Sequence, residues 1–286
     1  MKKTLFFLIL ASMLLVVGIA LAEEATDEVQ LVYSRIIDVP GVGEWPYYAQ
    51  NDPLWSDSIY EPFKSDRYRI VCETGCGAIA GAIALSRQLA PEELPLLLES
   101  RNPYKDGFEF CPCSINGWRC NREHEKQFAT TVEDFQTYLP VIVANYAAGN
   151  NTRREKFRST QDGTSIQLYR SLAEAYGLHY IGSNKWDDAV EALKKGYSVV
   201  TTVTKGVFTP ISHFLVIANI DEEYVYVLDP YMRESYAHMD KKGLLEVIEP
   251  GLVRAKLTDL SKLRFSGYYM FRKPIPFGRT ADDAQN

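Results

Sequence analysis

The chain has 286 residues, with 37 acidic and 31 basic side chains and a formal net charge of −6 at pH 7. This acidic balance, without any long run of lysine or arginine, argues against a nucleic-acid partner. Hydrophobic residues make up 46% of the chain, so it can bury a substantial core, and the length suits one large domain or two small ones.

The N-terminus has the pattern of a secretory signal. Met1-Lys2-Lys3 precedes an almost wholly apolar run that ends at Ala20-Leu21-Ala22, just before two glutamates. A charged start, an apolar centre and a small-residue cleavage site predict a signal peptide over 1–22. An uncleaved membrane anchor is the alternative, but the run is near the lower limit for a span. We therefore expect a secreted or extracytoplasmic protein with no membrane association after cleavage.

The rest of the chain is expected to be one domain with short appendages. Residues 23–45 read as an N-terminal arm that is acidic, then extended, and closes in a turn at 40–43. The main domain is expected over 46–276, with an inserted loop at about 101–125. The tail at 277–286 is polar and is expected to be loose.

Helical patterns come mainly before strand patterns. Helices are predicted at 77–88, from 91 onward, and at 131–138, 166–176 and 186–195. Gly177 and Gly196 provide C-terminal caps for the last two. Strands are predicted at 197–203, 213–220, 224–228 and 268–272. Segregation of helices from strands favours an α+β fold.

The cysteines predict disulfides and one free thiol. An odd number of cysteines in an exported chain leaves one without a partner. If Cys76 is that thiol, two arrangements stay open, because a bridge between Cys111 and Cys113 would be strained. These are Cys72–Cys111 with Cys113–Cys120, or Cys72–Cys113 with Cys111–Cys120. The alternative is zinc held by Cys111, Cys113, Cys120 and His124, which the irregular spacing and the oxidising compartment disfavour.

Cys76 is the candidate nucleophile. It lies between Gly75 and Gly77, and the Ala/Ile/Leu run that follows predicts a buried helix. The glycines permit a tight turn and close backbone approach. A cysteine at a helix N-terminus meets unpaired N–H groups, which favour the reactive thiolate. The alternative is a small core residue, and a nucleophile also needs a base.

His213 and Asp229 supply that base and its partner. His213 begins an apolar strand, and Asp229 follows the next strand in an Asp-Pro pair. A hairpin turning at 221–223 pairs position 213 with about 230 or 231, so Asp229 is expected beside His213. A carboxylate next to an imidazole fixes its tautomer and stabilises its charged form. Either residue alone could be structural; the pairing is what favours a catalytic role.

Three stretches together resemble the papain-like superfamily of cysteine peptidases, and more narrowly its bacteriocin-processing branch, cysteine peptidase family 39. They are Tyr-Tyr-Ala-Gln-Asn-Asp-Pro-Leu-Trp at 47–55, Gly-Cys-Gly at 75–77, and Ser-His-Phe at 212–214 with the later Asp-Pro. The helix–Gly–strand at 192–200 is similar to the family's scaffold. The resemblance covers roughly 45–232. Ala78-Ile79-Ala80 departs from the family's Pro-Thr/Ser, and the 101–125 segment lies outside its usual pattern.

The resemblance implies a papain-like fold in which a nucleophile helix packs on an antiparallel sheet. It also implies hydrolysis of a peptide or protein substrate through a thioacyl-enzyme. Cys76 would be the nucleophile, His213 the base, Asp229 its orienting acid and Gln50 an oxyanion donor. Neither a metal nor an organic cofactor is expected. Two alternatives stay open, a transglutaminase-like acyltransferase and an inactive cell-surface binding module of the same fold.

Overall fold

The computed structural model describes residues 32–57, 60, 70–94, 108–110, 127–129, 132–148, 158–160 and 163–274. From Tyr33 onward the chain forms one compact unit. The predicted signal peptide, the start of the arm, the tail, and Cys111, Cys113, Cys120 and His124 lie outside the described residues. Within the described part, no helix is both long enough and apolar enough to cross a bilayer.

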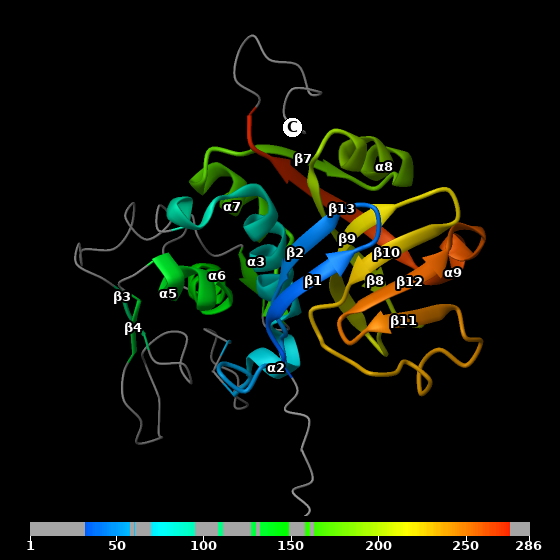
Figure 1. The fold of residues 1–286 in the computed structure, drawn as a ribbon, viewed down its shortest axis with the longest axis horizontal. Helices are drawn as coiled ribbons and strands as arrows, with labels where there is room; N and C mark the ends of the chain where they lie inside the picture. The colour runs from blue at the N-terminus through cyan, green and yellow to red at the C-terminus, as the bar shows by residue number, and fades with distance from the viewer. Residues whose placement is uncertain are drawn as a thin grey trace, which may run out of the picture. The chain divides into compact units, whose positions relative to one another are not determined.

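Helices and strands are arranged as Figure 1 shows. The helices are α2 (Val71–Thr74), α3 (Cys76–Gln88), α5 (Val132–Thr137), α6 (Leu139–Ala148), α7 (Gln167–Ala175), α8 (Trp186–Lys194) and α9 (Leu260–Leu263), with 3₁₀ turns at Pro91–Glu93 and Leu257–Asp259. Three pairs of strands lie outside the main sheet: β1 (Arg35–Val39) with β2 (Gly43–Tyr47), β3 (Phe108–Phe110) with β4 (Gln127–Ala129), and β5 (Ser159–Thr160) with β6 (Gly163–Thr164).

The main sheet has seven antiparallel strands in the order β11-β12-β10-β9-β8-β13-β7. Its members are β7 (His179–Ser183), β8 (Ser198–Thr204), β9 (Ser212–Ile220), β10 (Tyr224–Leu228), β11 (Leu245–Glu249), β12 (Leu252–Lys256) and β13 (Phe265–Arg272). The fold is therefore α+β, with helices and an antiparallel sheet, and is consistent with the papain-like class. The predicted strands correspond to β8, β9, β10 and β13, whereas β7, β11 and β12 were not predicted.

The turn expected at 40–43 closes the β1–β2 hairpin. Gly41 and Gly43 have φ angles of +76° and +83°, a left-handed region that glycine occupies without strain. The side chain of Asn219, near the end of β9, donates to the carbonyl of Pro40 at 2.7 Å. This contact fastens the hairpin to the main sheet.

The central strands bury side chains on both faces. Val200 and Val216 belong to the same core as α3, whereas Val199 and Ile217 belong to the core that includes Ala189 and Ala192 of α8. Neighbouring residues of a strand point to opposite faces. The sheet is thus covered on both sides, and this fixes which residues of β9 and β10 share a face.

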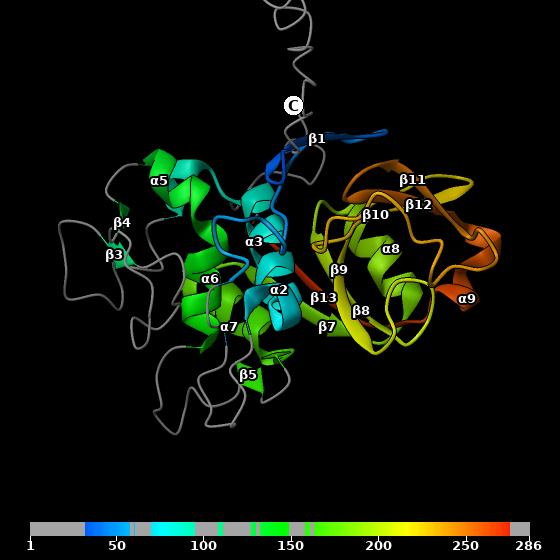
Figure 2. The ribbon, with the colours of Figure 1, turned by 90° about the horizontal axis from the view of Figure 1, so that it is seen from below.

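Helix α3 is buried from Gly77 to Leu85 and packs against α6, α7 and strands β8 and β9. Figure 2 shows it between α6 and β9. Its small residues allow neighbours to approach closely; a Cβ added at Gly81 would lie 3.1 Å from a methyl of Leu172 in α7. The helix that the sequence predicts at 77–88 is therefore the centre of the helical part.

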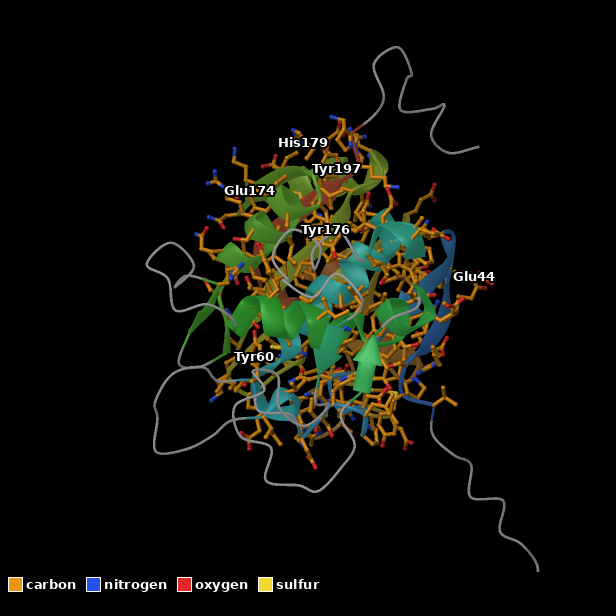
Figure 3. All side chains as sticks on the ribbon, turned by 90° about the vertical axis from the view of Figure 1, so that its left-hand side faces the viewer. Glu44, Tyr60, Glu174, Tyr176, His179 and Tyr197 are labelled. Atoms are coloured by element: carbon orange, nitrogen blue, oxygen red, sulfur yellow. The ribbon has the colours of Figure 1, made fainter. Side chains whose placement is uncertain are left out.

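Both predicted glycine caps are present. Gly177 follows α7 with φ +64°, and Gly196 follows α8 with φ +76°. Just after these caps, Tyr197 bonds to Nδ1 of His179 in β7 at 2.7 Å, and Figure 3 labels both residues. The caps turn the chain directly into β7 and β8.

Candidate active site

The two glycines around Cys76 are required by close contacts. A Cβ at Gly75 would lie 2.7 Å from Val71, and a Cβ at Gly77 would lie 2.4 Å from the Cβ of Thr164. Neither position has room for a side chain. Cys76 itself is half-buried and is the first residue of α3, so its backbone N–H has no acceptor within its own helix.

Two buried tyrosines surround the beginning of α3. Tyr169 donates to the carbonyl of Gly77 at 3.0 Å, and the hydroxyl of Tyr60, labelled in Figure 3, bonds to that of Thr164 at 2.6 Å. Burial raises the pKa of both tyrosines, so both remain neutral. Their aromatic rings lie near Cys76 and carry no charge.

The β9–β10 hairpin brings His213 and Asp229 together. A bulge between Tyr226 and Val227 shifts the register, so that Leu228 faces Val216. Continuing this register places His213 opposite the loop that begins with Asp229. His213 Nε2 lies 2.6 Å from Asp229 Oδ1, with both side chains buried.

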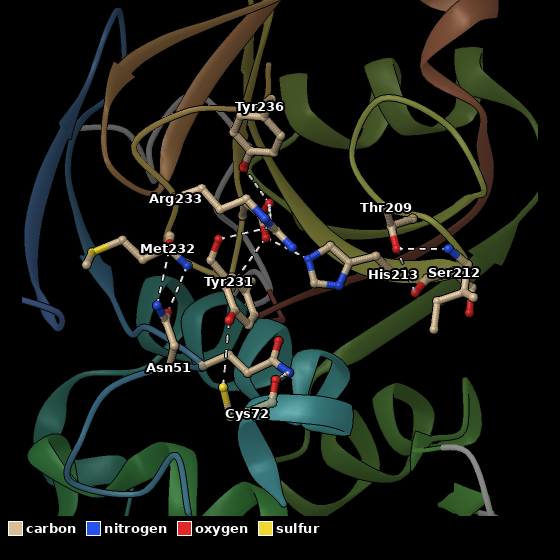
Figure 4. Close-up of polar contacts among 12 residues, drawn as sticks. Asn51, Cys72, Thr209, Ser212, His213, Tyr231, Met232, Arg233 and Tyr236 are labelled. Carbon is tan, nitrogen blue, oxygen red and sulfur yellow. Dashed lines mark hydrogen bonds and ion pairs between the residues drawn. The ribbon is translucent and has the colours of Figure 1, made fainter. Parts of the chain in front are cut away.

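Both oxygens of the Asp229 carboxylate are occupied. Oδ1 also accepts the backbone N–H of Tyr231 at 2.8 Å, while Oδ2 accepts Arg233 Nη1 at 2.7 Å and the hydroxyl of Tyr236. Figure 4 shows the side chains of Arg233, Tyr236 and His213 pointing toward one another in this region. Burial opposes ionisation, but His213, Arg233 and Tyr236 together lower the pKa of Asp229. The carboxylate is therefore ionised.

The same contacts favour the charged form of His213. Burial works against the charge, but the negative charges of Asp229 and Cys76, and hydrogen bonds to both, raise the pKa of the imidazole. Because Nε2 bonds to Asp229, Nδ1 is the ring nitrogen left to interact with Cys76. The arrangement can hold an imidazolium between a thiolate and a carboxylate, which is the chemistry of an activated cysteine nucleophile.

Gln50 lies next to the turn that precedes Cys76. It is 2% exposed, and its Nε2 donates to the carbonyls of Val71 at 2.8 Å and Cys72 at 2.9 Å. Its Oε1 is buried and has no hydrogen-bond partner among the described residues. Both amide N–H groups are thus held by α2 in this structure, one turn before the nucleophile.

Sequence reasoning missed several residues that support this site. Arg233 and Tyr236 hold the Asp229 carboxylate, and the hydroxyl of Tyr47 donates to the Asp229 carbonyl at 2.7 Å. Asn51 exchanges two hydrogen bonds with the backbone of Met232 (Figure 4). The contacts of Tyr47 and Asn51 join segments far apart in the chain, whereas Arg233 and Tyr236 follow Asp229 within seven residues. Tyr47 and Asn51 lie in the same 47–55 stretch as Gln50, and this position could have drawn attention to them.

The thiol of Cys72 is not in the state that the sequence predicts. Cys72 was predicted to form a disulfide with Cys111 or Cys113, but in the structure its thiol is free and donates to the hydroxyl of Tyr231 at 3.9 Å. Burial raises the pKa of this thiol. The other halves of both predicted bridges lie outside the described residues. Within the described ranges there is no group of three or more potential metal ligands, and the alternative zinc site at 111–124 also falls outside them.

Comparison with known proteins identifies the family. No curated protein matches the chain. The sequence profile described as the Peptidase_C39 like family matches residues 44–247, a range that contains Gln50, Cys76, His213 and Asp229. Since the match spans more than half of the chain, the protein belongs to this family of cysteine-peptidase-like proteins.

Proposed function

We propose that the protein is an exported cysteine peptidase that hydrolyses peptide bonds through Cys76, His213 and Asp229. One observation carries the proposal: a buried imidazole is hydrogen-bonded to the Asp229 carboxylate and lies near enough to Cys76 for the negative charge of Cys76 to raise the pKa of the ring. Membership of a cysteine-peptidase-like family supports it. The signal-like N-terminus supports the exported location.

In the first half of the reaction, Cys76 Sγ attacks the carbonyl carbon of the scissile bond as a thiolate. The C–N bond breaks, and the proton on His213 Nδ1 passes to the leaving amine. In the second half, water gives a proton to Nδ1 and its oxygen attacks the thioacyl carbon, so that the carboxylic acid product leaves and the thiolate returns. Asp229 holds the ring in the required tautomer throughout.

The oxyanion that develops during the reaction needs hydrogen-bond donors to stabilise it. The backbone N–H of Cys76 is the first of α3 and has no acceptor within that helix, which makes it a candidate donor. The side chain of Gln50 can contribute if one of its N–H groups moves from the Val71 or Cys72 carbonyl to the oxyanion. The proposed role of Gln50 thus includes an exchange of hydrogen bonds during turnover.

The test follows the acyl acceptor directly. The mature protein is incubated with a mixture of unstructured peptides in water enriched in ¹⁸O, with and without an added primary amine, and products are identified by mass spectrometry. The Cys76→Ala variant is the control. Hydrolysis places ¹⁸O in new C-terminal carboxyl groups. Products carrying the amine instead would support a transglutaminase-like acyltransferase, and intact peptides in all samples would support a binding module.

A further inference from the structure

Two side chains that take no part in the proposed reaction bind Oδ2 of the Asp229 carboxylate, the oxygen that does not contact His213. Arg233 Nη1 lies 2.7 Å from Oδ2, and the Tyr236 hydroxyl bonds to the same oxygen. On the other oxygen, His213 is joined by the backbone N–H of Tyr231. Four donors therefore hold a carboxylate that is fully buried, and its plane cannot turn without breaking several bonds.

Arg233 is itself held in place. Its guanidinium carbon lies 4.3 Å from the centre of the Tyr231 ring and 5.5 Å from that of Tyr236. Nη1 also donates to the Tyr231 carbonyl at 3.2 Å, and only 18% of the side chain is exposed. A planar guanidinium suits this combination of stacking and hydrogen bonding. A fixed positive charge therefore remains beside the carboxylate.

Charges alternate along the site. Cys76 and Asp229 are the negative groups of the proposed active form, and His213 and Arg233 are the positive ones. In buried surroundings such charges interact strongly. Asp229 acting alone would hold the imidazolium proton tightly, whereas Arg233 competes for the same carboxylate and repels the imidazolium. The effect is to weaken the hold on a proton that must leave in every cycle.

The other titratable groups around these four charged side chains add little charge. Burial raises the pKa of Tyr47 and of Tyr236, so both are neutral. Beyond them, Arg35 and Glu249 form an ion pair at 2.8 Å. The groups facing Asp229 and His213 come from β2, α3 and the loop after β10, and are Tyr47, Cys76, Tyr231, Arg233 and Tyr236. Cys72 of α2 contacts Tyr231 behind them. Among the described groups, Arg233 is the permanent cation in contact with the carboxylate.

We propose that Arg233 is a positioning residue with two effects. It fixes Asp229 so that one oxygen faces His213 Nε2, and it limits how far the carboxylate raises the proton affinity of the imidazole, whose Nδ1 proton passes to the leaving amine. The inference rests on the proposed function for its place in the reaction. The effect on His213 can be measured without any substrate, so the two proposals can fail separately.

The experiment is an NMR titration of the His213 ring in histidine-labelled protein carrying Cys76→Ala, which removes the thiolate. The His213 signal is assigned by its loss in His213→Gln. Arg233→Gln keeps a hydrogen-bond donor but removes the charge, and it is expected to raise the pKa of His213 by roughly one unit. Arg233→Lys keeps the charge and is expected to leave the value close to that of the parent.

Arg254→Gln is the matched control. Arg254 also combines a carboxylate and a tyrosine ring, bonding to Glu246 at 2.8 Å and lying 4.3 Å from the ring centre of Tyr224. Arg254 contacts none of Cys76, His213, Asp229 and Arg233, so the titration of His213 should not change in Arg254→Gln. In protein with Cys76 intact, Arg233→Gln is expected to lower kcat by roughly tenfold with KM little changed, because only proton transfer is slowed.

An unchanged or lower pKa of His213 in Arg233→Gln overturns the proposal. If circular dichroism shows that this variant does not fold, Arg233→Met, which also removes the charge and keeps an unbranched side chain, decides. A rise in the pKa of His213 then supports the proposal, and an unchanged or lower value overturns it. If the wild-type protein cleaves no peptide, the proposed function fails, while the titration still decides what Arg233 does to His213.

Discussion

The backbone N–H of Gln50 donates to the carbonyl of Pro230 at 2.6 Å, and so joins the segment before the nucleophile helix to the loop that carries Asp229. Beside it, the Tyr47 hydroxyl donates to the Asp229 carbonyl and Asn51 bonds to the backbone of Met232. The N-terminal segment therefore holds the acid of the proposed triad in place. The site is complete only when these distant parts of the chain have docked.

Gln50→Ala is expected to lower kcat by roughly 10²-fold, the scale for losing one oxyanion donor. The effect should fall on kcat rather than KM, because the oxyanion exists only along the reaction path. Steady-state peptide hydrolysis measures it. Gln88→Ala is the control, since Gln88 also donates its amide to a backbone carbonyl, that of Gly196, at the other end of α3.

Two results would contradict the role assigned to Gln50. A rise in KM alone would make it a substrate contact. Loss of thiol labelling at Cys76 would make it a structural residue, consistent with its bonds to the carbonyls of Val71 and Cys72.

Asp229→Asn is expected to move the alkaline limit of activity to lower pH. The Asp229 charge is one reason why the pKa of His213 is raised to about 10 despite the opposing effect of burial. The imidazolium is present below that pKa and is lost as pH rises through it, so a lower pKa brings the loss to lower pH. The measurement is the pH profile of peptide hydrolysis.

The matched control for that profile is Asp259→Asn, which removes a carboxylate paired with Lys262 on the surface. Activity should fall less in Asp229→Asn than in His213→Ala, since orientation is removed and not the base. An alkaline limit that stays where it is in wild type would show that Asp229 does not control the charge of His213.

Gly77→Ala is expected to lower the free energy of unfolding by about 1–3 kcal/mol, the usual cost of overpacking. The added Cβ would lie 2.4 Å from the Cβ of Thr164, which cannot swing away. Gly81→Ala is the control in the same helix. Its Cβ meets a flexible methyl of Leu172 at 3.1 Å, and alanine gains about 1 kcal/mol of helix propensity over glycine. Urea unfolding should leave Gly81→Ala near wild type; equal losses in both would refute the close approach of Thr164.

Thiol reactivity separates Cys76 from Cys72. Both are expected to react with iodoacetamide in the folded, unreduced protein, because both thiols are free in the structure. Cys76 should react first near pH 7, since burial raises the pKa of the Cys72 thiol and only a thiolate is nucleophilic. Peptide mapping after brief and long exposure measures this order. Recovery of Cys72 in a disulfide with Cys111 or Cys113 would restore the original expectation.

Elements with a clear period or cap were predictable. Helices α7 and α8 combine an amphipathic pattern with a terminal glycine, and the β9–β10 hairpin follows from two β-rich runs around a short turn. Helix α6 was missed because its first turns, Leu139 to Ala144, are buried all round, so no polar face marks a helical period. Strands β11 and β12 extend one side of the sheet and depend on pairing with β10.

The site was predictable where local order determines it and not where long-range contacts do. Gly-Cys-Gly before an apolar run places Cys76 at a helix start, and the hairpin places Asp229 beside His213. The bulge at Tyr226 and Val227 shifts the register within that hairpin without separating the pair. The contacts of Gln50 on α2 and of Cys72 on Tyr231 follow from tertiary packing, which one sequence does not reveal. The contact of Arg233 with Asp229 is local, but it depends on the conformation of the loop after β10, for which the sequence carries no regular pattern.

The most direct test of the account compares peptide hydrolysis by wild type, Cys76→Ala and His213→Ala, with circular dichroism to verify folding. Wild type is expected to cleave the peptides, and either substitution is expected to abolish turnover while the spectrum and the unfolding transition are retained. Near-wild-type turnover in a folded Cys76→Ala or His213→Ala protein would contradict the central claim that these two residues are the nucleophile and its base.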